Sequence, residues 1–464
     1  MSSRKRKVRD DEPGSRNDEG VGVEGDSSDD DAADERDERD GCSGESDDSD
    51  VEDERLFVAC TLGELEEVER LHAAGAANVH AVDPEEGDTP LGAACRFGHI
   101  AVVQWLVAHG ADISTTNFVG ETVLHEACFH GSLPLVEWLL DQPGLQDSSA
   151  VLGRRNDRQM TPLAFASLHG HVDVVRLLAA RGAQVDVVDD QGHTLLHLAC
   201  SNGHVDAAVA LRELGVPTNT ADLTGRTPMH IACGQGQLEA AKWLHESCAA
   251  PVDAPDGAGA TPLHFASAAG DRPSFEWLLS SGASATRANQ YGNTPLHYAC
   301  QAGSLVMVEA LLAAGADRAA RNGDGDTPFL LASLGGHVEI AQLLHAKGES
   351  ADAINSSGCS AALQACAGGH LAMAQWLSSL LPASELERAD NSSLTPLHYA
   401  SVAGHVDVVE WLLAQGVSPT KTIARTAQHE GHTDVVKMLK KALKKGGAGE
   451  GSSSMGGSSA PGSQ

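Results

Sequence analysis

A histidine and a cysteine lie three residues apart in the segment NTPLHYACQAGS, at His297 and Cys300. In a helix, this spacing places both side chains on one face. Such a pair could join a thiol nucleophile to its general base, or offer two ligands to a metal ion. The choice between a site and a scaffold depends on whether this pair is unusual in the chain or repeated along it.

Histidines recur at two fixed positions, three and ten residues after a threonine or its equivalent. Those of the first group are His125, His197, His230, His264, His297 and His398, and those of the second are His99, His171, His204, His337, His370, His405 and His432. Because they recur in phase, we expect these side chains to hydrogen-bond the backbone at helix starts and turns. A catalytic role is not expected.

Cysteines and tryptophans follow the same register. Cys60, Cys95, Cys128, Cys200, Cys233, Cys300 and Cys366 lie at the sixth position, and Trp105, Trp138, Trp243, Trp277, Trp376 and Trp411 at the sixteenth. Ser167 and Ser401 replace cysteine in two copies, so the sixth position requires small size rather than a thiol. Stacked helices lie about 8–10 Å apart, too far for neighbouring cysteines to bridge without backbone movement. The tryptophan position predicts packing between helices.

No other motif indicates catalysis. The chain contains no GxGxxG opening a helix, no GxxxxGK[ST], no HExxH and no GxSxG. The GDGD stretch at 323–326 lacks the remaining ligands of a calcium loop. We therefore expect a protein that is not an enzyme, with no metal and no cofactor.

The residues described above recur because the sequence itself repeats, with a period of 33 residues in most copies. Its threonines are Thr89, Thr122, Thr161, Thr194, Thr227, Thr261, Thr294, Thr327 and Thr395, with Ser360 in the one gap, and a glycine follows nine residues after each. Two degenerate copies extend it, Glu54 with Gly63 and Thr422 with Gly431.

Each repeat predicts a pair of helices. Threonine is a good N-cap, proline suits the first helical position, and glycine accepts the left-handed conformation that ends a helix. A second apolar-periodic segment follows, such as HVDVVRLL at 171–178, and then a turn rich in Asp, Asn and Gly. One such pair cannot bury its own apolar face, so the repeats must stack.

The segment TPLHYACQAGSLVMVEALLAAGAD resembles an ankyrin repeat, and the resemblance extends over residues 51–445. It implies an all-α repeat solenoid of about twelve stacked helix-turn-helix units with β-hairpin fingers. It also implies an inner helix that lines a concave groove used to bind other proteins. The first unit lacks TPLH, the tenth reads SAALQA, and the last begins only 27 residues after Thr395. We interpret these three units as capping repeats or degenerate copies.

Composition and charge predict a soluble intracellular protein with reduced thiols. The ten cysteines form no close CxxC pair, and no apolar run reaches the about 18 residues that a membrane span needs. Residues 1–53 carry 21 acidic and 8 basic side chains, so −13 of the net charge of −33 lies there. This acidic excess disfavours nucleic-acid binding. We expect a monomer that binds proteins and neither nucleic acid nor membrane.

Three regions follow: a disordered acidic region at 1–53 with a basic start, the repeat array at 54–445, and a disordered Gly/Ser-rich tail at 446–464. The basic start comprises Arg4, Lys5, Arg6, Lys7 and Arg9. It is interpreted as a nuclear-import signal or as a solvated end, so the expected location is the nucleus, the cytoplasm or both. Ser27, Ser28, Ser46 and Ser49 precede acidic residues and are candidate phosphorylation sites.

Partner binding should use positions that packing does not dictate, namely the finger tips and the two residues before the mid-repeat glycine. In the second to fourth repeats these are Arg96, Phe97, Phe118, Phe129, His130, Leu168 and His169. Exposed apolar patches and aromatic or arginine anchors are typical of contact sites. The alternative is that some of these side chains pack against neighbouring fingers.

The third repeat runs 39 residues, and its lengthened loop carries Arg154, Arg155 and Arg158. One interpretation is a solvated loop. The other is that this loop and the nearby aromatic residues receive an acidic–apolar partner segment, for which the acidic N-terminus competes.

Two functions fit the sequence. The first is a non-catalytic scaffold or adaptor that binds partners on the concave face. The alternative is a regulatory inhibitor that masks a basic surface of a client protein, such as an import signal or a nucleic-acid-binding face. A basic client and steep salt dependence would distinguish the inhibitor.

Overall fold

The computed structural model describes residues 48–75, 78–145 and 148–447, and within these ranges the chain forms α-helices, two short 3-10 helices and no strand. The described chain divides into two compact units, one with the residues up to Ala232 and Gln237–Ala250, the other with Cys233–Gly236 and the residues from Pro251.

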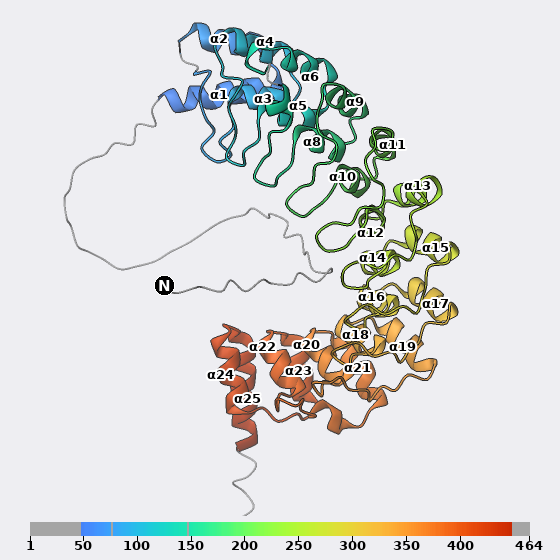
Figure 1. The fold of residues 1–464 in the computed structure, drawn as a ribbon. Helices are drawn as coiled ribbons and strands as arrows, with labels where there is room; N and C mark the ends of the chain where they lie inside the picture. Colours follow the sequence, from blue (N-terminus) through green and yellow to red (C-terminus); the bar gives the residue numbers. More distant parts are fainter. Residues whose placement is uncertain (1–47, 76–77, 146–147, 448–464) are drawn as a thin grey trace, which may run out of the picture. The chain divides into compact units, whose positions relative to one another are not determined.

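In the first compact unit, inner and outer helices alternate along the chain (Figure 1). The inner helices are α1 (Asp48–Leu62), α3 (Pro90–Arg96), α5 (Val123–His130), α8 (Pro162–Leu168) and α10 (Leu195–Ser201), followed at the boundary by α12 (Pro228–Gly234). The outer helices are α2 (Leu65–Ala73), α4 (Ile100–Ala108), α6 (Leu133–Leu140), α9 (Val172–Ala180), α11 (Val205–Glu213) and α13 (Leu238–Cys248). The lengthened third repeat adds η1 (Pro143–Leu145) and α7 (Ser148–Leu152). Consecutive inner helices contact each other, as the stacking argument predicts.

The second compact unit repeats this arrangement. Its inner helices are α14 (Pro262–Ala269), α16 (Pro295–Gln301), α18 (Pro328–Leu334), α20 (Ala361–Ala367), α22 (Pro396–Val402) and α24 (Lys421–His429). Its outer helices are α15 (Arg272–Ser280), α17 (Leu305–Ala313), α19 (Val338–Ala346), α21 (Leu371–Leu380), α23 (Val406–Ala414) and α25 (Thr433–Gly447), with η2 (Ala383–Leu386) after α21. The all-α repeat prediction is confirmed.

The inner helices begin and end as the sequence predicts. Thr89 is the N-cap of α3, and its Oγ1 accepts the Gly92 N–H at 3.1 Å. Gly131 ends α5 in the left-handed conformation, with φ 84°. Two terminal assignments were wrong. Glu54 lies inside α1 rather than at a helix start, and Thr420, not Thr422, caps α24 through the Ile423 N–H.

The fingers are tight turns, and an Asx side chain shapes each one. In the third repeat, Asn117 Oδ1 accepts the N–H groups of Val119 at 3.2 Å and Glu121 at 2.8 Å, and Thr116 forms a single antiparallel bridge with Thr122. The same position carries Asn156, Asp189, Asp222, Asp256, Asn289, Asn322, Asn355 and Asp390. The predicted β-hairpin fingers are therefore present as tight turns capped by the Asx side chain, and three of the described ones carry a single antiparallel bridge, at Thr116–Thr122, Val188–Thr194 and Ile354–Ser360.

Successive fingers of the first compact unit are joined by one backbone hydrogen bond each. Phe118 N–H donates to Glu86 O at 3.0 Å, and Asp157 N–H donates to Val119 O at 2.9 Å. These bonds set the fingers in a row beside the inner helices, which is how residues about one repeat apart come to share a surface.

The array is slightly longer than the predicted range of 54–445, since α1 begins at Asp48 and α25 ends at Gly447. Residues 48–53 are thus helical, and Ser49 lies on α1. The import cluster Arg4–Arg9, the serines Ser27, Ser28 and Ser46, and the tail from 448 lie outside the described residues. Within the described ranges, no helix is long and apolar enough to cross a membrane.

Candidate functional site

The histidine–cysteine pair is part of the scaffold. His297 Nδ1 accepts the Thr294 N–H at 3.1 Å, so Nε2 carries the proton and donates to Asp326 O of the next repeat at 3.2 Å. Burial lowers the pKa of His297 and raises the pKa of the Cys300 thiol. A histidine with both nitrogens engaged cannot serve as a base, and a thiol held protonated is a poor nucleophile. The structural prediction for both residues is confirmed.

The histidines at the tenth position bond the preceding repeat, whereas His297, at the third position, bonds the following one. His99 Nε2 bonds Thr61 O at 2.9 Å, and His171 Nε2 bonds Phe129 O at 2.9 Å. Each ring lies over the glycine of the preceding repeat: a Cβ on Gly63 or Gly131 would come within 2.4 Å or 2.2 Å of it. In the described part of the chain, no three His, Cys, Asp or Glu side chains are grouped to hold a metal ion.

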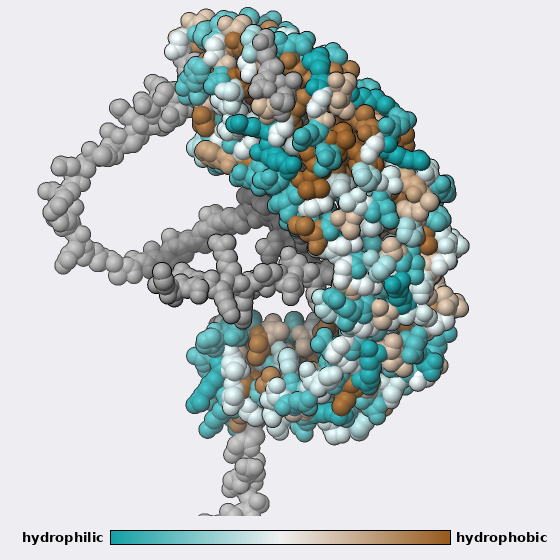
Figure 2. All heavy atoms as spheres, viewed as in Figure 1, coloured by the Kyte–Doolittle hydropathy of each residue, from teal (hydrophilic) through white to brown (hydrophobic). Residues whose placement is uncertain are grey.

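Exposed large apolar side chains are most closely spaced at the start of the array. Among the described residues, eight of the seventeen exposed large apolar side chains fall between Val51 and Phe129. They are Val51, Val58, Leu62, Val82, Phe97, Phe118, Val119 and Phe129. In Figure 2, apolar and hydrophilic residues lie side by side on the visible face of the first compact unit. An exposed cluster of this kind is typical of a contact surface.

A hollow of about 270 Å³ lies within this cluster, between α1, the finger at 83–88 and α3. We call it the N-terminal groove; it is lined by Glu54, Phe57, Val58, Thr61, Asp83, Glu86, Asp88, Ala93, Arg96 and Phe97. Its volume is below the about 300–1,000 Å³ of small-molecule sites. The groove therefore suits one or two side chains of a partner better than a free ligand.

Of the predicted aromatic residues, Phe97 lines this groove, Phe118 lies against Gly87 of the finger that borders it, and Phe129 belongs to α5 of the next repeat. Phe97 is 46% exposed, Phe118 63% and Phe129 42%. Packing against neighbours is present as well: the Phe118 ring lies so close to Gly87 that a Cβ there would come within 2.3 Å, and the rings of Phe129 and His169 meet edge to face at 4.4 Å. The rings of Phe118 and Phe129 are thus packed on one side and open on the other, and partner binding by these residues stays a prediction.

Arg96 is not available as a partner anchor, which corrects the prediction. Its Nε and Nη2 donate to the two carboxylate oxygens of Glu126 at 2.8 Å each, and its Nη1 donates to Glu86 at 2.8 Å. The Glu126 side chain is only 4% exposed. These bonds raise the pKa of Arg96. Burial raises the pKa of Glu126, although the hydrogen bonds and positive charge of Arg96 act to lower it. The sequence could not show this, because the two residues lie 30 positions apart.

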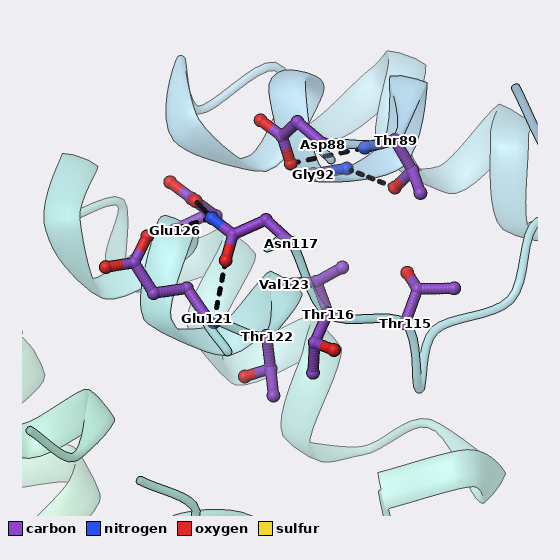
Figure 3. A pocket seen from close by; sticks show the side chains of 10 residues that line it. All are labelled: Asp88, Thr89, Gly92, Thr115, Thr116, Asn117, Glu121, Thr122, Val123 and Glu126. Carbon is purple, nitrogen blue, oxygen red and sulfur yellow. Dashed lines mark hydrogen bonds between the residues drawn. The ribbon is translucent and has the colours of Figure 1, made fainter. Parts of the chain in front are cut away.

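Glu126 is also linked to the finger of its own repeat, and Figure 3 shows it beside Asn117 and Glu121. Asn117 Nδ2 donates to Glu121 at 3.0 Å and lies 3.4 Å from Glu126. Asn156 Nδ2 donates to the other oxygen of Glu121 at 3.1 Å. The network joins the second, third and fourth repeats and so stiffens the wall of the N-terminal groove.

The three loop arginines separate into two kinds. Arg155 Nη1 donates to Gln159 O at 3.1 Å and to Val188 O at 2.8 Å. Arg321 makes the equivalent pair of bonds in the second compact unit, so Arg155 supports its finger rather than a partner. Arg154 and Arg158 are exposed and form no ion pair among the described residues.

The remaining predicted residues are covered to different degrees. His130 is exposed, with its ring over Gly98, whereas Leu168 and His169 are half-buried. The sequence argument missed Val58, Leu62 and the groove carboxylates Glu54, Asp83 and Glu86. The register could have found Val58 and Leu62, because they lie four and eight residues after Glu54, the positions that face the groove in later repeats.

Comparison with known proteins identifies the family of the repeats. The family model described as "Ankyrin repeats (3 copies)" matches residues 56–150, 146–222, 213–289, 250–322, 274–355 and 329–423. The chain therefore belongs to the ankyrin repeat family, whose repeats generally act as modules that bind other proteins. A crystal structure of the human ASB11 ankyrin repeat domain is similar, with 26% identity over 50% of this chain and 99% of that one and a TM-score of 0.43. No curated protein gives a significant match.

Proposed function

We propose that this protein is a non-catalytic scaffold or adaptor, monomeric on its own, whose partners dock on the N-terminal groove. The observation that carries the proposal is the exposure of Phe97 in a hollow formed by two inner helices and a finger, with Phe118 and Phe129 exposed in the next repeat. Aromatic side chains held at fixed positions by packing on one side make good binding anchors, because little conformational entropy is lost when they are covered.

The test is affinity purification from cells, comparing the wild-type chain with a triple variant, Phe97→Ala, Phe118→Ala and Phe129→Ala. Proteins recovered with the wild type and lost with the variant support the proposal. A matched control replaces Tyr291, an exposed aromatic finger residue of the second compact unit, with alanine. If the triple variant retains every partner, the groove is not the docking site.

The alternative function, an inhibitor that masks a basic client surface, is favoured by one specific observation. Four carboxylates line the groove, at Glu54, Asp83, Glu86 and Asp88, whereas its one basic side chain, Arg96, is already paired. An inhibitor requires that the client lose an activity on binding, and a scaffold does not. A client assay with and without this protein distinguishes the two.

Location and regulation complete the proposal. Arg4, Lys5, Arg6, Lys7 and Arg9 are proposed to direct nuclear import, so that the protein resides in the nucleus as well as the cytoplasm; their composition supports this. Replacing all five with alanine in a fluorescent fusion should keep it cytoplasmic. Ser27, Ser28, Ser46 and Ser49 are proposed phosphorylation sites, which mass spectrometry of the purified protein would test.

A further inference from the structure

The surface around the N-terminal groove is strongly and one-sidedly charged. Residues 51–131 contain 14 acidic and 3 basic side chains. All three basic ones are already paired: Arg55 with Glu52 at 2.9 Å, Arg70 with Glu67, and Arg96 with Glu86 and Glu126. The positive charge of residues 51–131 is thus neutralised internally, and this segment keeps an excess of negative charge.

Several carboxylates at the groove have no cation of their own. Glu54 and Glu85 are exposed and form no ion pair among the described residues. Asp83 lines the groove and accepts only backbone N–H groups, from Glu85 at 2.9 Å and Glu86 at 2.7 Å. The lining combines carboxylates with the apolar side chains of Phe57, Val58, Ala93 and Phe97. A cleft lined mainly by one sign of charge attracts a cation more strongly than isolated surface groups do, because low-dielectric walls concentrate the field.

Apolar area and negative charge therefore lie on the same surface. Val58 and Phe97 line the hollow, and Phe118 extends the apolar surface along the next finger. An acidic–apolar segment, as the loop arginines suggested, would gain the apolar contacts but would meet like charge. A basic–apolar segment gains both.

We propose that the N-terminal groove recognises a partner segment in which lysine or arginine lies next to a bulky apolar side chain; this rests on the proposed function and names its partner. The apolar side chain enters the hollow against Val58 and Phe97. The cationic side chains pair with Glu54, Asp83 and Glu85 at its border. Arg154 and Arg158 lie in the loop of the third repeat and take no part.

One competing occupant belongs to this chain. Its basic start, Arg4–Arg9, has the charge that the groove prefers but carries a single valine as its apolar side chain. The proposed occupant of the groove carries a bulkier apolar side chain than valine. For this reason we assign the groove to a partner segment rather than to residues 4–9.

Three synthetic peptides test the proposal against the full chain, with affinities measured by fluorescence anisotropy. The first alternates lysine pairs with leucine and phenylalanine, the second replaces each lysine with glutamate, and the third keeps the lysines and replaces the apolar residues with serine. We expect the first to bind at least tenfold more tightly than either of the others. We also expect its affinity to fall as salt rises from 50 to 200 mM. Equal affinities for the first two peptides would overturn the proposal.

Two matched variants locate the binding. Glu54→Gln with Glu85→Gln should weaken binding of the first peptide by about three- to tenfold. Glu66→Gln with Glu69→Gln changes the net charge equally on the exposed side of α2 and should leave the affinity unchanged. Equal weakening by both pairs would mean that only the overall charge is sensed, and would overturn the assignment to the groove.

Two further comparisons separate the possible failures. If the triple phenylalanine variant loses partners from cells but the lysine and glutamate peptides bind wild type equally, the proposed function stands and this inference fails. If the triple variant keeps its partners, the proposed function fails. Deleting residues 1–9 should change peptide affinity by less than twofold; a gain of tenfold or more would assign the groove to the chain's own start.

Discussion

His193 offers a quantitative test of how neighbouring fingers are held together. The residue lies at the end of one finger, with Nδ1 3.0 Å from Asp189 Oδ2 of the same finger and Nε2 3.4 Å from Asp222 Oδ2 of the next. The second distance is long for a hydrogen bond but within reach of an ion pair. The two carboxylates raise the pKa of His193 from its ordinary 6.5 to about 9. A charged imidazole thus bridges two repeats at neutral pH.

The stabilisation that the charged His193 provides can be worked out from this shift in its pKa. At about 1.36 kcal/mol per pKa unit, the full shift corresponds to roughly 3 kcal/mol. The side chain is 20% exposed, so solvent screening reduces this to about 1–2 kcal/mol. Because the folded pKa is raised, the stabilisation is fully present below about pH 6.5 and is lost as the pH rises through about 9.

The perturbation is His193→Gln, and His193→Asn is its control. Asparagine occupies the equivalent position at Asn293 and there bonds Asn322 of the next finger at 2.9 Å. Each variant loses the positive charge of the imidazole. The free energy of local opening of the two fingers should therefore be higher in wild type than in either variant by about 1–2 kcal/mol at pH 6.5, and by much less at pH 9.5.

Local opening is the appropriate measurement, since repeats unfold in part independently of one another. Hydrogen exchange at the Leu223 amide reports it directly, because this N–H donates to Gln191 O across the two fingers at 3.1 Å. Exchange protection should be lower in both variants at pH 6.5 and should converge with wild type at pH 9.5. A difference of the same size at both pH values would refute the charged bridge.

Three other predictions concern the same scaffold. Gln159 and Ser393 occupy finger positions with φ of 60° and 63°, where the other repeats of the array mostly carry glycine. Gln159→Gly or Ser393→Gly should each raise stability by about 0.5–1 kcal/mol in urea unfolding, and Ser393→Ala should not. Glu126→Gln removes the carboxylate that Arg96 bonds twice and should cost about 1–2 kcal/mol, since Arg96 keeps Glu86; an unchanged urea midpoint would contradict this. Gly87→Ala should lower stability by at least 1 kcal/mol, because its Cβ would meet the Phe118 ring and φ is 71°; a neutral effect would contradict the packing of that ring.

Most of the fold could be predicted from signals that act within a few residues of one another. A threonine cap, a proline after it and a glycine nine residues on act within one helix, so Thr89 and Gly98 could be assigned without any tertiary information. The errors fell where these signals are weak. The acidic residues 48–53 were interpreted as disordered, yet they belong to α1, whose Leu56 and Cys60 are fully buried.

The exposure of the candidate site residues was predictable from the sequence, but their side-chain contacts were not. The register correctly placed Phe97 and Phe129 on an exposed face. It could not show that Arg96 pairs with Glu126 or that Arg155 bonds Val188 O, because these contacts join residues about one repeat apart through side-chain geometry. Only the structure shows that the free charge at the groove is negative.

Photo-crosslinking in cells tests the central claim most directly. A photoreactive amino acid replaces Phe97 in one version of the chain and Ala302, the equivalent exposed residue of the eighth repeat, in another. If the N-terminal groove is the docking site, position 97 should capture partner proteins, and the captured peptides should carry basic and bulky apolar residues. Capture at position 302 but not at 97 would contradict the account.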